Sequence, residues 1–194
     1  TIVNPTCFGF SNGVISLTVS GGTQPYNFEW TDETGTVVAS GEGKNEVNGL
    51  VSGEYKVMIK DADGNIYQDV YVVSENPELV VTTSLLSVLE NKCYNDEDGV
   101  IILDIKGGTN IYTVDWGSVD PSKLQSDNHA IGLGAKIYNI DVKDSNGCQV
   151  SHSVEVTQPN KTLSATSTVK QNKCYNATEG EIDLIVDGGT PNYR

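Results

Sequence analysis

Four cysteines are the residues of this chain best suited to covalent chemistry, and three of them begin the same sequence motif. Thirteen residues separate each of Cys7, Cys93 and Cys174 from a Gly-Gly-Thr sequence. The fourth, Cys148, directly follows an Asn-Gly turn in the second copy. Cysteines of a small domain can pair as disulfides, and single cysteines are often buried thiols. Residue types alone leave both outcomes open.

Acidic turns are the second place where chemistry is conceivable. Asp61, Asp63 and Asn65 alternate as the first ligands of an EF-hand calcium loop do, but the glycine and glutamate required at its sixth and twelfth positions are missing. Asp and Asn are also ordinary turn residues. The same holds for the acidic run at residues 95–98. Solvated turns are therefore the favoured interpretation, and we expect no cofactor beyond a weak role for calcium.

Aromatic side chains could form a platform for sugars. Trp30 and Trp116 each alternate with aromatic or apolar residues along a short segment, which favours a place in the core. Tyr67 and Tyr71 are better candidates for an exposed aromatic face.

Catalytic chemistry has little support in the sequence. The two histidines, His129 and His152, do not recur between the copies. No nucleophile elbow, phosphate-binding loop or cysteine–histidine metal spacing is present. We therefore expect no enzyme activity and no catalytic, cofactor-binding or metal-binding residues.

The charge of the chain limits its partners. It has 26 acidic and 12 basic residues, for a net charge of −14. Such a surface repels phosphate backbones and anionic lipid, so neither nucleic acid nor a membrane surface is an expected partner. No run of 18 apolar residues and no charged-then-apolar leader occurs, and we expect neither membrane insertion nor a signal peptide in this stretch.

The elements that must position these residues are strands. Every second residue is apolar at 15–19, 101–105 and 182–186, and Asp-Gly and Asn-Gly turns separate later alternating runs. The Gly-x-Tyr-x-Val sequence at 53–57 resembles a tyrosine corner. Short strands with frequent turns predict an all-β fold of tandem immunoglobulin-like antiparallel β-sandwiches.

The repeated sequence motif also predicts the domain organisation. Its copies begin 86 and then 81 residues apart, and Asn76-Pro77 and Gln158-Pro159 end the closing strands. We expect one β-sandwich repeat over residues 1–77, a second over 78–159, and the N-terminal part of a third over 160–194. The chain is expected to be a stretch of a longer tandem array.

These motifs together resemble the SprB-type repeat of large surface proteins of Bacteroidota. The resemblance covers essentially the whole chain, although Asn65 stands where repeat one should have its closing cysteine and Ile111 replaces a proline in repeat two. In repeats one and two it rests on these residues: Cys7, Asn12, Gly13, Gly21, Gly22, Thr23, Pro25, Tyr26, Trp30, Gly53, Tyr55, Asp61 and Gly64, then Cys93, Asp98, Gly99, Gly107, Gly108, Thr109, Tyr112, Trp116, Tyr138, Asp144, Gly147 and Cys148.

The resemblance implies an extracellular place, which favours disulfides. We therefore expect a structural disulfide between Cys93 and Cys148. It would close a loop of 55 residues, worth about 4 kcal/mol in the chain-entropy model. Cys7 has Asn65 at the matching position, and the matching partner of Cys174 would lie beyond Arg194.

The resemblance also implies a function. We expect a structural and adhesive segment of a cell-surface filament, a gliding-motility adhesin stalk exported by the type IX system and attached to the outer membrane. Its expected partners are further repeats of the same chain, external surfaces or polysaccharide, and gliding and secretion machinery bound through other regions. The alternative is a carbohydrate-binding module array of a secreted polysaccharide-degrading enzyme.

Overall fold

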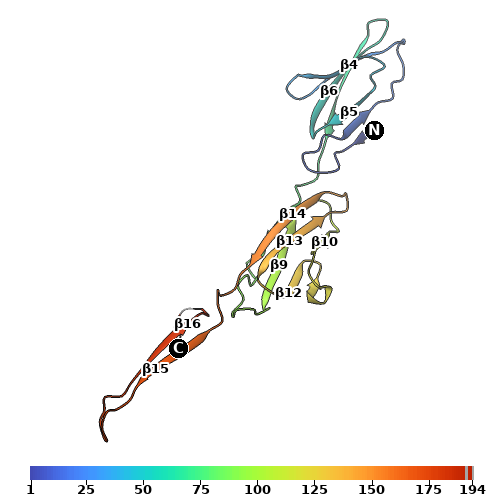
Figure 1. The fold of residues 1–194 in the computed structure, drawn as a ribbon. Coiled ribbons are helices and arrows are strands. Elements are labelled where there is room, and N and C mark those ends of the chain that lie inside the picture. Colours follow the sequence, from blue (N-terminus) through green and yellow to red (C-terminus); the bar gives the residue numbers. More distant parts are fainter. Residues whose placement is uncertain (191, 194) are drawn as a thin grey trace. The chain divides into compact units, whose positions relative to one another are not determined.

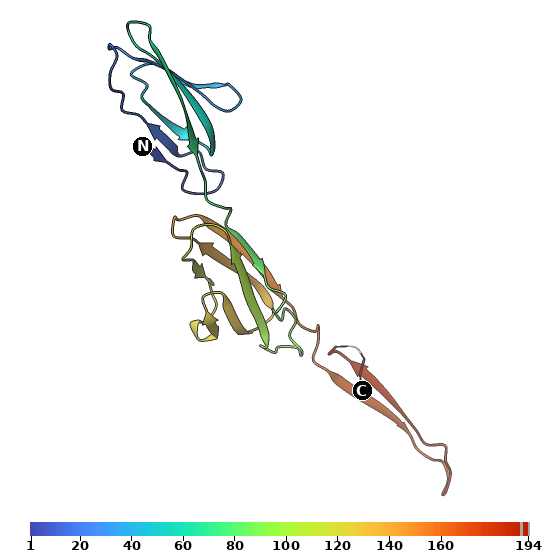
Figure 2. The same ribbon diagram turned by 180° about the vertical axis from the view of Figure 1, so that it is seen from behind.

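The computed structural model describes residues 1–190, 192 and 193 and is built from antiparallel sheets (Figures 1 and 2). The prediction of an all-β, immunoglobulin-like fold is confirmed. Within these residues the only helical element is the short 3-10 turn η1 (Pro121–Lys123). No described helix is long and apolar enough to cross a membrane.

Repeat one forms two sheets around one core. The sheet orders are β1-β2-β5 and β4-β3-β6-β7. Inward-facing residues of both sheets meet in a core that includes Ile15, Trp30 and Val57. The strands are β1 (Ile2–Val3), β2 (Gly13–Ser16), β3 (Asn27–Thr31), β4 (Val37–Glu42), β5 (Glu46–Leu50), β6 (Gly53–Lys60) and β7 (Ile66–Val73).

Repeat two has the same plan, with a longer first sheet. The orders are β11-β12-β9-β8 and β10-β13-β14. Of the third repeat, the described residues form one antiparallel pair, β15 with β16. The strands are β8 (Val80–Thr83), β9 (Gly99–Lys106), β10 (Thr113–Asp115), β11 (Leu124–Ser126), β12 (His129–Leu133), β13 (Lys136–Lys143), β14 (Gln149–Val156), β15 (Ser164–Lys170) and β16 (Glu181–Asp187).

Tryptophan and tyrosine anchor each sandwich. Trp30 is fully buried, and its indole Nε1 donates a hydrogen bond to the Lys44 carbonyl at 2.9 Å. Trp116 is 4% exposed and donates to Asp127 in the same way. The hydroxyl of Tyr55 donates to the carbonyl four residues upstream, as a tyrosine corner does. The expected core positions of the tryptophans are confirmed.

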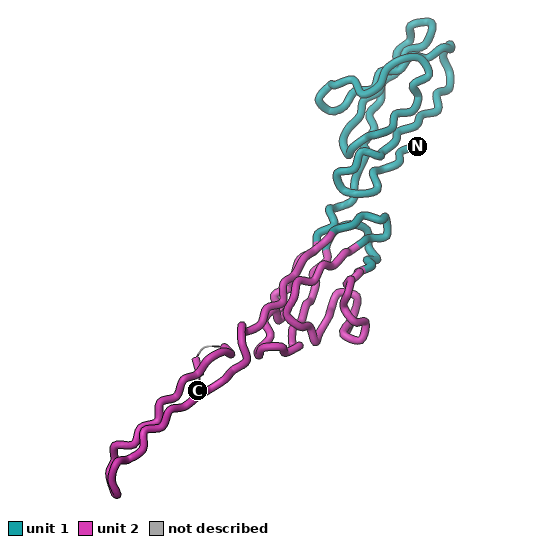
Figure 3. The backbone as a smooth tube through the Cα atoms, viewed as in Figure 1, with its two compact units in different colours: residues 1–80, 106–113, 143–150 teal, residues 81–105, 114–142, 151–194 magenta. Residues whose placement is uncertain are grey.

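Contacts divide the chain into two compact units (Figure 3). The first contains residues 1–80 together with two turns of repeat two, 106–113 and 143–150; the second contains the remaining residues. The repeat boundaries at 77/78 and 159/160 come from the sequence pattern and stay predictions.

A disulfide holds one of these turns within the first unit. Cys148 is bonded to Cys7, with their Cα atoms 5.6 Å apart, and the side-chain amide of Asn146 donates to the Thr6 carbonyl. Cys93 is an exposed free thiol. The predicted disulfide between Cys93 and Cys148 is therefore wrong.

The reason lies in the length of β14. The backbone N–H of Asn95, in the Cys93 turn, donates to Gln158, which follows β14. Cys148 directly precedes the same strand, whose eight residues span roughly 25 Å. A disulfide requires Cα atoms within about 7 Å. The two cysteines of repeat two thus lie at opposite ends of one strand and cannot pair.

We predict that peptide mapping without reductant will find Cys7 linked to Cys148. Cys93 and Cys174, both exposed thiols, should react with an alkylating agent in the folded protein. Asp96 raises the pKa of the Cys93 thiol, so Cys93 should react slowly near neutral pH because less thiolate is present.

Cys93→Ala is the matched control and should keep the link, whereas Cys7→Ala should release a reactive thiol at Cys148. A linked pair containing Cys93 and Cys148 would contradict the structure.

Candidate functional site

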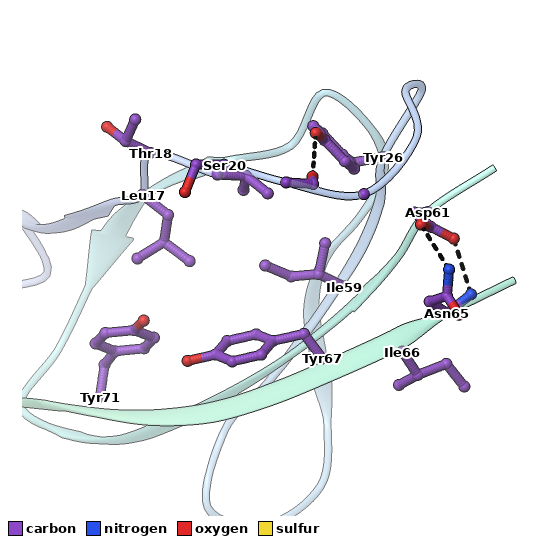
Figure 4. Close-up of a pocket in the computed structure, with 13 residues that line it drawn as sticks. Leu17, Thr18, Ser20, Tyr26, Ile59, Asp61, Asn65, Ile66, Tyr67 and Tyr71 are labelled. Carbon is purple, nitrogen blue, oxygen red and sulfur yellow. Dashed lines mark hydrogen bonds between the residues drawn. The ribbon is translucent and has the colours of Figure 1, made fainter. Parts of the chain in front are cut away.

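A groove of about 450 Å³ lies in repeat one between the chain that follows β2 and the start of β7 (Figure 4). Residues 17–22 form one wall, and Tyr67 and Tyr71 of β7 form the other. Ile59 of β6 lies between the two walls. The groove thus gathers two of the aromatic side chains that the sequence placed on an exposed face.

The first wall is a strand that stops early. Leu17 and Val19 continue the inward alternation of Ile15, but β2 ends at Ser16 and both side chains are only half-buried. Within the described residues, Thr18, Val19 and Ser20 form no backbone–backbone hydrogen bond. The wall therefore presents apolar side chains and unpaired backbone groups together.

The second wall is organised by one carboxylate. Tyr67 and Tyr71 lie two residues before and two residues after Asp69 on β7, and both hydroxyls donate to Asp69 Oδ2, at 3.0 and 3.1 Å. The hydrogen bond to Asp69 raises the pKa of Tyr67, and burial raises the pKa of Tyr71. Both phenols stay neutral at physiological pH, and Tyr67 is 57% exposed.

An aspartate closes the end of the groove. Asp61 accepts hydrogen bonds from the backbone N–H groups of Asn65 and Thr23, at 2.8 and 3.1 Å, and from the Asn65 side chain. The Asn65 hydrogen bond is the main cause of a lowered pKa at Asp61. This carboxylate ties the closing hairpin to the Gly-Gly-Thr turn.

Repeat two contains the same tie. Asp144 is 5% exposed and accepts from the backbone N–H groups of Thr109, Asn146 and Cys148, all within 2.9 Å. Burial opposes its ionisation, but these N–H groups together lower its pKa. The Asp and Asn residues of the hairpins therefore stabilise turns.

The acidic positions considered for calcium are engaged with protein partners. Asp63 accepts from the Thr23 hydroxyl, and in the acidic run Glu97 pairs with Lys123 at 2.8 Å. Across the described residues, no group of three His, Cys, Asp or Glu side chains is placed to hold a metal ion. A weak role for calcium stays a prediction.

The histidines do not join the groove. His129 lies on β12, and His152 on β14 shares a 2.8 Å hydrogen bond with the Thr83 hydroxyl. At the positions of Tyr67 and Tyr71, counted from the shared Asp-x-x-Gly turn, repeat two has Val150 and Val154. The aromatic wall of repeat one is therefore not reproduced in repeat two.

A family model for the SprB repeat matches residues 1–35 and 166–194. Both stretches contain a cysteine turn and the Gly-Gly-Thr sequence that follows it. No curated protein matches the chain.

Several solved structures resemble the chain at low identity. The amphioxus IgVJ-C2 molecule is 13% identical with a TM-score of 0.32, covering 74% of this chain and 94% of that one. Fibronectin(III)-like modules of Clostridium thermocellum CbhA are 17% identical with a TM-score of 0.31, covering 81% and 94%. Murine CEACAM1b is 9% identical with a TM-score of 0.32, covering 81% and 97%.

We predict that acid will loosen the two aspartate ties. Because the folded-state pKa of Asp61 and of Asp144 lies below the ordinary value of 3.8, their stabilisation is complete above that value and is lost as the pH falls through the lowered pKa. The wild-type Tm should therefore fall as the pH drops below about 4.

Replacing both aspartates by asparagine should lower the Tm at pH 7 by several degrees. It should also reduce the fall of the Tm below about pH 4, as followed by circular dichroism. If the Tm of the variant fell with decreasing pH as steeply as that of the wild type, the proposed role of the two ties would be contradicted.

Proposed function

We propose that this chain, which a SprB repeat model matches over residues 1–35 and 166–194, is a SprB-type repeat protein of the cell surface and forms a structural and adhesive segment of an extracellular filament. In finer detail, the proposal is a gliding-motility adhesin stalk, exported by the type IX system and attached to the outer membrane. Further repeats would continue the filament, while gliding and secretion machinery would bind other regions. The role needs no catalysis.

The disulfide between Cys7 and Cys148 carries the proposal because it sets the path that tension would take through the chain. Cys7 and Cys148 are covalently joined across 141 positions. A pull applied at the two ends of the chain would pass through the S–S bond, and the residues between the cysteines would carry no extending force. The bond would thus protect most of two repeats from being unravelled, which suits a stalk.

The surface suits the same role. With a net charge of −14, neighbouring filaments would repel one another, which limits self-association. Adhesion to external surfaces or polysaccharide would come from many weak copies of one surface acting together.

A carbohydrate-binding array has weaker support. Such an array should expose an aromatic platform in each repeat. Repeat one has Tyr67 and Tyr71 at the relevant positions, whereas repeat two has valines at the matching positions. Both tryptophans are buried.

The test is single-molecule extension with handles at both ends of the chain. In oxidising buffer the residues between the cysteines should add no contour length when the chain is extended. Reductant should add roughly 480 Å, at roughly 3.4 Å for each of the 141 positions.

Cys7→Ala and Cys148→Ala should each show the full length in both buffers, and Cys93→Ala should behave as the wild type. A contour length that does not respond to reductant would remove the main support for a role in transmitting force.

A further inference from the structure

A second cavity of repeat one, of about 420 Å³, lies between the hairpin that joins β3 to β4 and the tyrosine corner. We call it the corner pocket. It is lined by residues 32–34, Val38 and residues 47–55. All of these segments belong to the first compact unit.

The corner pocket has an equivalent place in repeat two. The glycine ahead of the corner is Gly49 in repeat one and Gly132 in repeat two, and both have a left-handed backbone, with φ of +75° and +65°. The corner tyrosine follows six residues later in each, as Tyr55 or Tyr138, and its hydroxyl donates to the carbonyl four residues upstream. The two repeats thus build the same backbone around this place.

In repeat two a lysine of the chain itself occupies that place. The ammonium group of Lys123 donates to the Gly132 carbonyl oxygen and, at 2.8 Å, to Glu97 Oε2. The lysine stem also lies against the glycine, because a Cβ on Gly132 would be 4.0 Å from Lys123 Cδ. The glycine carbonyl beside the tyrosine corner is therefore an acceptor for a primary ammonium group.

Repeat one has the same glycine but no lysine to match. Its hairpin is longer, and the residues that correspond to Lys123 lie at 37–40, where the sequence reads Val-Val-Ala-Ser. Among the described residues that line the corner pocket there is no lysine, arginine or histidine. The place that repeat two fills from within is thus open in repeat one.

Acidic side chains surround the open pocket. Asp32, Glu33 and Glu54 line it. The hydrogen bond from the Thr34 hydroxyl is the main cause of a lowered pKa at Asp32, which is therefore ionised at neutral pH. Burial is the main cause of the raised pKa of Tyr55, and the charges of Asp32 and Glu33 add to it. At Tyr138 of repeat two, the charge of Lys123 acts in the opposite direction.

The walls of the pocket suit the aliphatic part of a lysine. Val38 and Val51 line it and are 40% and 47% exposed, while Val47 and Leu50 are buried behind them. A lysine covers apolar surface with its methylene stem and keeps its ammonium group at a polar rim. The corner pocket offers both surfaces.

We propose that the corner pocket binds a lysine side chain of a basic polypeptide outside the filament. The Gly49 carbonyl accepts a hydrogen bond from the ammonium group, as Gly132 does from Lys123, and the surrounding carboxylates attract its charge. The methylene stem packs on Val38 and Val51. Because the chain has 26 acidic and 12 basic residues, a second copy is repelled and a basic partner is attracted.

As a means of gripping an external surface, the pocket rests on the adhesive role proposed above, and it names the chemistry that such a surface must present. Binding of lysine itself is measured without that role. Extension of the chain under force depends on the bond between Cys7 and Cys148 and on no side chain of the pocket. The failure of one proposal can therefore be distinguished from the failure of the other.

The test is titration of the 194-residue chain with the peptide acetyl-Gly-Lys-Gly-amide, in about 150 mM salt so that distant charges are screened. Backbone amide NMR should show saturable shifts at residues 32–36 and 47–55. The same peptide with an acetylated lysine side chain should bind about tenfold or more weakly. So should glucosamine, which has an ammonium group but no methylene stem. Equal binding of either probe, or no binding at millimolar peptide, would overturn the proposal.

Glu33→Gln combined with Glu54→Gln should weaken binding of the lysine peptide about fivefold or more. The matched control is Glu29→Gln combined with Glu42→Gln, which removes the same charge from β3 and β4 at positions that do not line the pocket. The control should bind within about twofold of the wild type. An equal loss in both double variants would show attraction by net charge alone and would overturn the proposal.

Val38→Lys gives a second readout, because it supplies from within the ammonium group that repeat two has in Lys123. This variant should no longer bind the peptide. Val70→Lys adds the same charge at an exposed valine of β7 outside the pocket and should bind within about twofold of the wild type. Retained binding in Val38→Lys would overturn the proposal.

Sedimentation of the chain alone tests the other occupant, a second copy. The wild type should stay monomeric at the concentration of the titration. A dimer that dissociates when Glu33→Gln and Glu54→Gln are introduced would place a lysine of a second copy in the pocket and would overturn the external partner.

Discussion

One interaction, the aspartate tie between the closing hairpin and the Gly-Gly-Thr turn, supports the other notable features of this protein. Asp61 and Asp144 hold the N–H groups of Thr23 and Thr109 respectively, and each also caps its own hairpin. A carboxylate that accepts several N–H groups is strongly held in its ionised form. The tie thus places two turns, distant in sequence, side by side in each repeat.

Both long-range features depend on these paired turns. In repeat two the tied hairpin presents Asn146 and Cys148, which reach the turn containing Thr6 and Cys7. In repeat one the tied glycine pair forms the end of the groove. The two tie aspartates, one of them considered as a calcium ligand, therefore position the disulfide and one end of the groove of repeat one.

Much of the fold follows from local patterns. Alternation identified the strands at residues 101–105 and 182–186 and the buried sides of Trp30 and Trp116, because side chains on a strand point alternately to its two faces. Comparison of the copies could also have drawn attention to the disulfide. Cys148 has no equivalent in repeat one, where Asn65 stands, and pairing within repeat two leaves only Cys93 as its partner.

The sequence by itself determined which segments are strands, which residues turn and which side chains are buried, since these depend on neighbours along the chain. Only the tertiary structure decided which cysteines meet and which side chains line the groove of repeat one. Cys93 and Cys148 share a repeat but lie at the two ends of β14, while Cys7 and Cys148 are 141 positions apart and in contact. Proximity across such distances is set by how whole strands are stacked, and no local pattern records it.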